Sequence, residues 1–277
     1  MASRTVTLLC AGCASPSSQP AAKFGKTATD SLTIIADARS ADLDLIRETG
    51  IERRASSYLS GGPITIDHPP PKSLTLLEDQ LDAITAINEY ATALAKATDP
   101  KGIQDLRDAT GKIPGAANAL LAAIPVSAPS PLTPAITLIS TVAVDIIDLQ
   151  IRAELRQIIE TVNPYLIAFI DHIILDGPTV DAELKGAYHS WINAKTANLS
   201  IIPGNYAVSY YAYREADTIA QNFKHRLAVL NNNKIVEVLV AMRKAHTALL
   251  STDIDFEAAF SEFSQIAASI NKISTGK

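Results

Sequence analysis

The chain has 277 residues, of which 47% are hydrophobic and 19% are charged, a composition that indicates a globular protein and excludes a disordered one. Its net charge of −5 and the scatter of its basic residues exclude the basic surface that nucleic-acid-binding proteins carry. Glycine and aromatic residues are few, and long alanine-containing amphipathic stretches predict an all-α protein. We expect antiparallel helical bundles with long amphipathic helices and a buried central helix.

The chain begins with a short apolar run at residues 5–12, preceded by Arg4 and followed by Cys13. A positive start, an apolar core and small residues at the cut are the order of a secretory signal. The run is too short to span a bilayer, which takes about 20 apolar residues as a helix. We therefore interpret residues 1–12 as a signal segment.

Residues 9–13, Leu-Cys-Ala-Gly-Cys, resemble the lipobox of bacterial lipoproteins. In that family the box ends in a cysteine that is acylated and becomes the mature N-terminus. The resemblance therefore implies that Cys13 is lipidated and anchors the protein to a bilayer, on the periplasm-facing side of the bacterial cell envelope. It departs from the family's pattern at Cys10, where leucine is usual, and it covers only the first 20 residues, so it implies no fold.

Two other interpretations of this segment stay open. Cys10 and Cys13 form a C-x-x-C pair, but a thioredoxin-like site needs a preceding strand, and a zinc site needs two more ligands. The other alternative is a disordered start of a cytosolic protein. No cysteine follows Cys13, which suits a chain exported to an oxidising compartment because no thiol is left to mispair.

The next predicted elements are a tether and two helices. Residues 13–23 are rich in serine and proline and are expected to be a polar tether. Apolar residues then recur at near-helical spacing over 24–58, and Gly61-Gly62-Pro63 should end that helix. After a proline-rich linker, a second helix is expected to start near Ser73 and to stop at Asp99-Pro100.

A third helix is expected over 101–109, interrupted at Gly111 and Pro114 before a further helical piece at 116–124. Together, residues 24–124 form the predicted N-terminal helical hairpin region.

The 32 residues from Ile113 to Val144 carry no charge and include five prolines. We interpret them as a helix end, a proline-rich connector at 125–134 and the start of a buried central helix. The alternative is an apolar hairpin that enters a membrane. Core burial is favoured because Asp145 and Asp148, which follow directly, would be costly in lipid.

The central helix is expected over 135–162 and past Pro164 to residue 175, with Asp176-Gly177-Pro178 ending it. Its apolar residues lie on several faces, which indicates a helix surrounded by neighbours. Arg156 and Glu160 are four residues apart and are expected to pair along its surface.

A shorter helix at 181–198 should follow, and Pro203-Gly204 should then precede a long one. An asparagine turn at 231–233 leads to two more helices, the last capped by Thr252 or Asp253. The last three helices suggest an up-down-up bundle, so residues 135–277 form a C-terminal helical bundle, unless 24–277 form a single domain.

Known catalytic and nucleotide-binding motifs are absent from the sequence, and we expect no metal and no cofactor. We interpret Asp171-His172 as a surface pair, because adjacent residues point to different helix faces. Asp145 and Asp148 are interpreted as the polar edge of the central helix. His225 and His246 lie on different predicted helices, and two histidines do not make a metal site.

The most suggestive cluster is aromatic. Tyr206, Tyr210 and Tyr213 fall at i, i+4 and i+7 of one predicted helix, with Tyr188 and Trp191 upstream. Rings with a polar tip suit the rim of a partner interface or a ligand groove, so these five residues are the candidate ligand or partner surface. The alternative is that they fill the join between two helical layers.

These observations favour a non-enzymatic protein. With the lipobox resemblance, they predict a lipid-tethered helical scaffold or binding protein whose partners are the bilayer, through acylated Cys13, and another envelope protein. One alternative is a membrane-active helical protein that inserts the uncharged segment 113–144. The other is an enzyme with an unrecognised carboxylate and histidine site around Asp145, Asp148, Asp171 or His172.

Overall fold

The protein is an all-α helical bundle, as the composition predicted. A computed structural model describes residues 18–63, 72–98, 100–122, 147–200, 206–229 and 231–274. These residues form seven helices and no strand: α1 (Ser18–Leu59), α2 (Lys72–Ala95), α3 (Pro100–Ala122), α4 (Ile147–Ser200), α5 (Tyr206–Val229), α6 (Asn232–Ala248) and α7 (Asp253–Ser274). The predictions for Cys10, Cys13, the connector at 125–134 and Asp145 lie outside the described residues.

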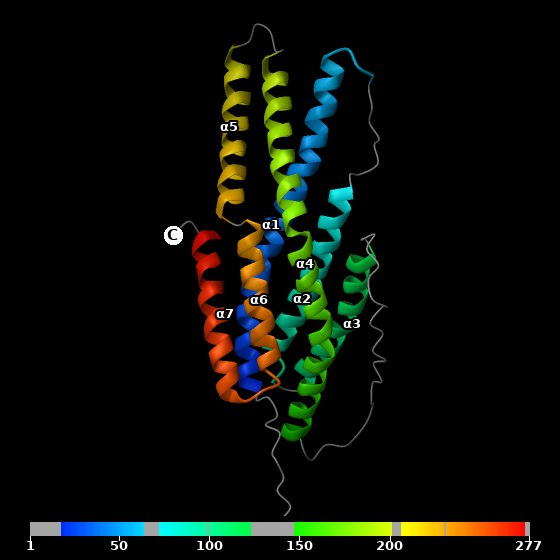
Figure 1. Ribbon diagram of the computed structural model, residues 1–277, viewed down its shortest axis with the longest axis vertical. Helices are drawn as coiled ribbons and strands as arrows, with labels where there is room; N and C mark the ends of the chain where they lie inside the picture. Colours follow the sequence, from blue (N-terminus) through cyan, green and yellow to red (C-terminus); the bar gives the residue numbers. More distant parts are fainter. Residues whose placement is uncertain are drawn as a thin grey trace, which may run out of the picture.

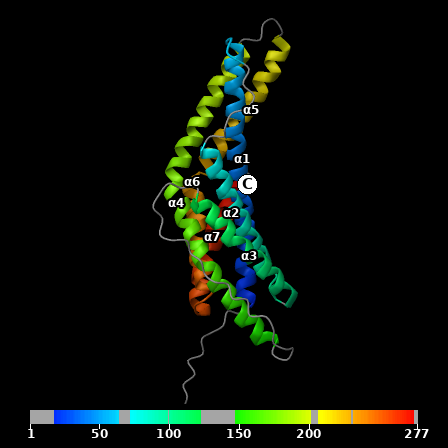
Figure 2. The ribbon, with the colours of Figure 1, turned by 90° about the vertical axis from the view of Figure 1, so that its right-hand side faces the viewer.

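The molecule is elongated and has two tiers (Figures 1 and 2). The two longest helices, α1 and α4, run through both tiers. The lower tier of Figure 1 adds α2, α3, α6 and α7 to them, whereas the upper tier adds α5. At 1.5 Å per residue, the 42 residues of α1 extend over about 60 Å, so one helix connects the two ends of the molecule.

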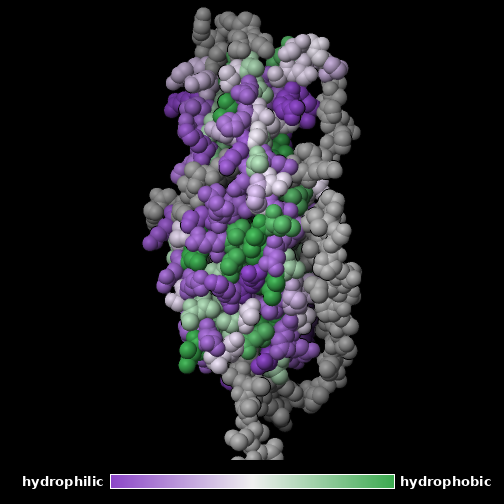
Figure 3. All heavy atoms as spheres, viewed as in Figure 1, coloured by the Kyte–Doolittle hydropathy of each residue, from purple (hydrophilic) through white to green (hydrophobic). Residues whose placement is uncertain are grey.

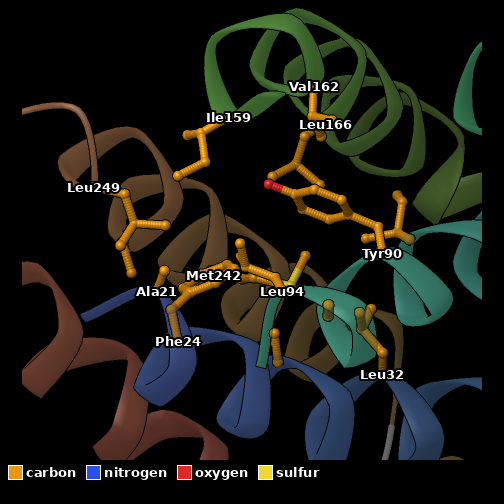
Figure 4. Packing of buried hydrophobic residues seen from close by; sticks show 14 of the residues in the cluster. Ala21, Phe24, Leu32, Tyr90, Leu94, Ile159, Val162, Leu166, Met242 and Leu249 are labelled. Carbon is orange, nitrogen blue, oxygen red and sulfur yellow. The ribbon is translucent and has the colours of Figure 1, made fainter. Parts of the chain in front are cut away.

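Most of the apolar core lies in the lower tier. Side chains of α1, α2, α3, α4, α6 and α7 form one buried cluster there. Figure 4 shows Phe24, Tyr90, Leu166 and Met242 converging from four of these helices. Each fully buried large apolar side chain contributes roughly 1.5–3 kcal/mol relative to an exposed one.

A second, smaller cluster holds the upper tier together. It consists of Leu43, Leu45, Ile46, Leu77, Val180, Leu184, Trp191 and Ala216, which belong to α1, α2, α4 and α5. On α1 the lower cluster ends at Ile35 and the upper one begins at Leu43; on α4 they are separated between Ile173 and Val180. We call the level between the two clusters the waist.

The predicted end of the central helix at Asp176-Gly177-Pro178 is wrong. α4 is a single 54-residue helix that continues through Pro164 and Pro178, and it includes the segment expected as a separate helix at 181–198. A proline inside a helix costs about 3 kcal/mol through a lost hydrogen bond and a steric clash. Here Ile173 before Pro178 and Val180 after it are anchored in the two clusters, so tertiary burial outweighs that local cost.

Two further predicted boundaries are corrected. α3 is continuous from Pro100 to Ala122 with Pro114 inside it, because Ile113 is buried in the core next to the proline. α1 begins at Ser18, so the last six residues of the expected tether at 13–23 are helical, with Ala21 buried.

The last three helices do not form the expected up-down-up bundle. α6 and α7 pack on each other in the lower tier, whereas α5 packs on α4 in the upper tier and lies above α6 (Figure 1). The reason is the apolar face of α5: Ala216, Ile219 and Phe223 pack into the upper cluster, away from α6 and α7. The expected asparagine turn is present as a cap, in which the Asn231 side chain accepts a hydrogen bond of 3.1 Å from the backbone nitrogen of Lys234.

The surface is mainly hydrophilic on the face shown in Figure 3, with apolar side chains gathered near its middle. Among the described residues, the segment Ile151–Leu199 of α4 is long and apolar enough to cross a bilayer, a property that buried bundle helices share. The predicted pair on this helix is confirmed, because Arg156 Nε lies 2.8 Å from Glu160 Oε1.

Candidate functional site

A group of exposed tyrosines stands out on the upper tier. The side chains of Tyr210, Tyr211 and Tyr213 on α5 are 58%, 69% and 63% exposed, and we call them the tyrosine face. The rings of Tyr210 and Tyr211 meet edge to face, with centroids 5.6 Å apart. Exposed aromatic rings on a soluble surface are candidates for a contact with another molecule, because water solvates the ring poorly.

The buried side of α5 explains why these tyrosines point outward. α5 packs through a narrow face of small and apolar residues, and its Phe223 meets Trp191 of α4 edge to face at 6.1 Å. Trp191 is 1% exposed and Tyr188 is half-buried, with its hydroxyl 3.4 Å from the carbonyl oxygen of Ala220. These two aromatic residues fill the join between α4 and α5, which is the alternative that the sequence left open for them.

The structure thus divides the predicted aromatic surface. Tyr210 and Tyr213 lie together on the tyrosine face, whereas Tyr188 and Trp191 lie in the packing behind it. Tyr206 begins α5, but its side chain is outside the described residues. The helical spacing missed Tyr211, the most exposed of the three, because it lies beside the i, i+4, i+7 series.

The buried polar groups form a separate set, which begins with His246 in the lower core. The His246 ring is 0% exposed; its Nδ1 lies 3.1 Å from Asn163 Oδ1 and its Nε2 lies 2.9 Å from the Tyr90 hydroxyl. An amide oxygen only accepts, so Nδ1 donates, and the neutral ring then accepts from Tyr90 through Nε2. Burial lowers the pKa of His246 to about 3 and raises that of Tyr90 above its usual value.

This arrangement gives His246 a structural role. Both ring nitrogens are occupied, the ring is neutral near pH 7, and no solvent reaches it. His225, the other histidine considered in the sequence, lies on α5 and is exposed. The local sequence carries no signal that identifies Tyr90 as a partner of His246, because the two residues are 156 positions apart in the chain.

A second buried polar group lies at the waist. Arg39 of α1 is 1% exposed and donates to Asn232 Oδ1 at 2.6 Å and to Asp42 Oδ2 at 3.3 Å. Burial lowers the pKa of Arg39, and the nearby carboxylates of Asp42 and Asp181 oppose that shift. A guanidinium remains charged in proteins, so the waist contains a buried cation held by groups from different helices.

The pair Asp171-His172 is not a surface pair, which corrects that interpretation for the histidine. His172 is 5% exposed and its Nε2 lies 2.8 Å from Asp176 Oδ2, whereas Asp171 is on the surface and pairs with Arg243 at 2.5 Å. Burial lowers the pKa of His172, and the Asp176 carboxylate opposes the shift. Adjacent positions do point to different faces, but the face of His172 is covered by the bundle.

No group of three histidine, cysteine, aspartate or glutamate side chains that could hold a metal ion is found among the described residues. Asp148 lies in α4, but its side chain is not described. The exposed tyrosine face is therefore the feature on which a function can be argued.

Comparison with known proteins adds no relative. The chain matches no protein-family model, no curated protein and no solved structure.

Proposed function

We propose that the protein is a non-enzymatic envelope lipoprotein, a helical bundle that is tethered to a bilayer through acylated Cys13 and presents the tyrosine face to another envelope component. The observation that carries the proposal is the exposure of Tyr210, Tyr211 and Tyr213 on a helix whose apolar side is already packed. Tyrosine is enriched where proteins bind partners, because its ring buries a large area at low entropic cost.

The position of the tyrosine face supports this function. α1 begins at Ser18, close after Cys13, at the lower end of the molecule in Figure 1, whereas α5 begins at the upper end. A bundle anchored near its lower end would hold the tyrosine face about 60 Å away along α1. Such a tether raises the effective concentration of the face for a partner in the same compartment.

Lipidation is tested by intact mass and cell fractionation. We expect the mature protein to begin at Cys13, to carry the mass of acyl chains and to fractionate with membranes. Cys13→Ser should abolish the acyl mass and allow a high-salt wash to release the protein from membranes. The matched control is Cys10→Ser, which should change neither property; a parent protein that carries no acyl mass, or that a high-salt wash releases from membranes, would contradict the anchor.

The role of the tyrosine face is tested by photo-crosslinking in cells. A photoreactive phenylalanine analogue in place of Tyr211 is expected to form crosslinks with an envelope component. The control position is Ile254 in the lower tier, an apolar residue that is 83% exposed. Equal crosslinking from both positions would contradict a specific role of the tyrosine face.

A further inference from the structure

We propose that the end of the molecule that carries the tyrosine face binds the surface of an anionic bilayer. We define the tip as residues 50–59 of α1, 192–200 of α4 and 206–214 of α5. This inference deepens the proposed function, because it names the chemistry of the partner.

The three segments of the tip lie together. Glu52 of α1 accepts hydrogen bonds from Lys195 Nζ at 2.6 Å and from Asn198 Nδ2 at 2.8 Å, which places the end of α1 beside the end of α4. α5 turns back along α4, since Tyr188 reaches the carbonyl of Ala220, so its first turns lie at the same level. Figures 1 and 2 both show α1, α4 and α5 meeting at the upper end.

The tip is basic in an acidic protein. Its segments contain Arg53, Arg54, Lys195 and Arg214 against one carboxylate, Glu52, a net charge of +3 in a chain of net charge −5; the exposed Glu215 that follows Arg214 reduces it to +2. The Glu52 carboxylate is 10% exposed and is occupied by Lys195. Within the part of the chain that the structure describes, no carboxylate pairs with the three arginines of the tip.

Other arginines of the bundle are paired, which makes this group distinct. Arg47 pairs with Glu78 at 2.8 Å, Arg107 with Glu154 at 2.8 Å and Arg243 with Asp171 at 2.5 Å. These three arginines, two on α1 and one on α5, therefore give the tip a positive charge that attracts phosphate headgroups.

The apolar side chains of the tip suit a membrane interface. Tyr58 and Leu59 at the end of α1 are 56% and 47% exposed, and the end of α1 lies at the same end of the molecule as the start of α5. Tyrosine is enriched at membrane–water interfaces, because its ring lies among the acyl chain ends while its hydroxyl stays hydrated. These groups are spread over α1 and α5 on either side of α4, an arrangement that fits a broad surface better than a narrow peptide.

Vesicle binding tests the inference without the lipid anchor. The full chain carrying Cys13→Ser is mixed with vesicles of phosphatidylcholine alone, or of phosphatidylcholine and phosphatidylglycerol in equal parts, and bound protein is measured by sedimentation. We expect binding to the anionic vesicles that weakens as salt rises, and little binding to the neutral ones. Equal binding to both compositions, or to neither, would overturn the inference.

Charge variants locate the contact. Arg53→Gln, Arg54→Gln and Arg214→Gln together are expected to weaken binding to anionic vesicles by about tenfold or more. The matched control removes the same charge from the lower tier with Lys101→Gln, Lys112→Gln and Lys244→Gln, and it should bind like the parent. Circular dichroism confirms that both sets remain folded; equal loss in the two sets would show only a net-charge effect and would overturn the role of the tip.

Tyrosine variants and dye release complete the test. Tyr210→Ser, Tyr211→Ser and Tyr213→Ser together should reduce the part of the binding that persists at high salt. Release of an encapsulated dye during binding would contradict docking on the surface, because it would require insertion. Crosslinks from Tyr211 to a protein, with no vesicle binding, would overturn this inference, but the proposed function would still stand. An unmodified Cys13 would overturn the lipid tether, but the vesicle result would still stand.

Discussion

The guanidinium of Arg39 and the side-chain amide of Asn232 are joined by a hydrogen bond of 2.6 Å between groups 193 residues apart in the chain. The bond connects the middle of α1 to the first residue of α6, at the waist between the two apolar clusters. A buried cation is costly unless it is paired and hydrogen-bonded, so the bond from Arg39 favours this position of α6 against α1. At the waist, this bond therefore positions α6 of the lower tier relative to α1, which runs through both tiers.

Removing the buried cation should destabilise the protein. We expect Arg39→Met to lower the free energy of unfolding by about 3 kcal/mol, because the Asp42 carboxylate stays buried without its guanidinium. The double variant Arg39→Met/Asp42→Leu should lose less, since an apolar pair leaves no buried charge. Urea denaturation measures both, and a double variant less stable than the single one would contradict this account.

The close contact of α4 with α6 predicts a sensitive glycine. A Cβ on Gly177 would overlap the side-chain amide of Asn232, so Gly177→Ala should cost about 1–3 kcal/mol. The matched control is Gly186→Ala on the same helix, where an added Cβ meets nothing within 4 Å. It should be neutral or stabilise by up to about 1 kcal/mol, because alanine favours a helix. Thermal unfolding of the two variants distinguishes the outcomes, and equal shifts would argue against the contact.

Burial of His246 predicts a pH dependence of stability. The pKa of the His246 ring is lowered from 6.5 to about 3 in the folded protein. Below pH 6.5 the unfolded chain therefore binds a proton at this ring that the folded protein does not bind. The stability contributed by the neutral ring is complete above pH 6.5 and is lost, by about 1.4 kcal/mol per pH unit, as the pH falls toward 3.

The variant His246→Gln isolates this effect. Denaturant unfolding of the parent and the variant at several pH values between 7 and 4 should show the difference in their stabilities shrinking as the pH falls. His172, whose pKa is also lowered, is present in both proteins and cancels from the difference. A difference that stays constant with pH would contradict a neutral, buried His246.

The separation of the two clusters predicts local destabilisation of the upper tier. Trp191→Ala removes the ring that meets Phe223 and should cost about 3–5 kcal/mol. Hydrogen exchange should quicken in α5 more than in α6 and α7, whose core lies in the lower tier. Phe263→Ala, in the lower cluster, should show the opposite pattern, and uniform acceleration in both variants would mean that the tiers unfold as one unit.

Several features were predictable because they depend on neighbours along the chain. The helical periodicity identified the fold class, and the i,i+4 spacing identified the pair of Arg156 and Glu160. The cap by Thr252 was also predictable, and its hydroxyl oxygen lies 3.3 Å from the backbone nitrogen of Asp255. In each case the interacting groups are within one helical turn, so local composition decides them.

Other features depended on partners far away in the chain. α4 continues through Pro178 because clusters on both sides bury their residues, and no local signal reports that burial. The environments of His246 and Trp191 were missed for the same reason, since Tyr90 and Phe223 become their neighbours only when helices pack.

The sequence by itself determined that the chain is helical, where most helices lie, and that tyrosines gather near residue 210. Only the tertiary structure decided which aromatic residues face solvent, which polar groups are buried and how the helices divide between two tiers. The physical reason is that helix formation depends on local hydrogen bonds and periodicity, whereas burial depends on which faces meet across the bundle.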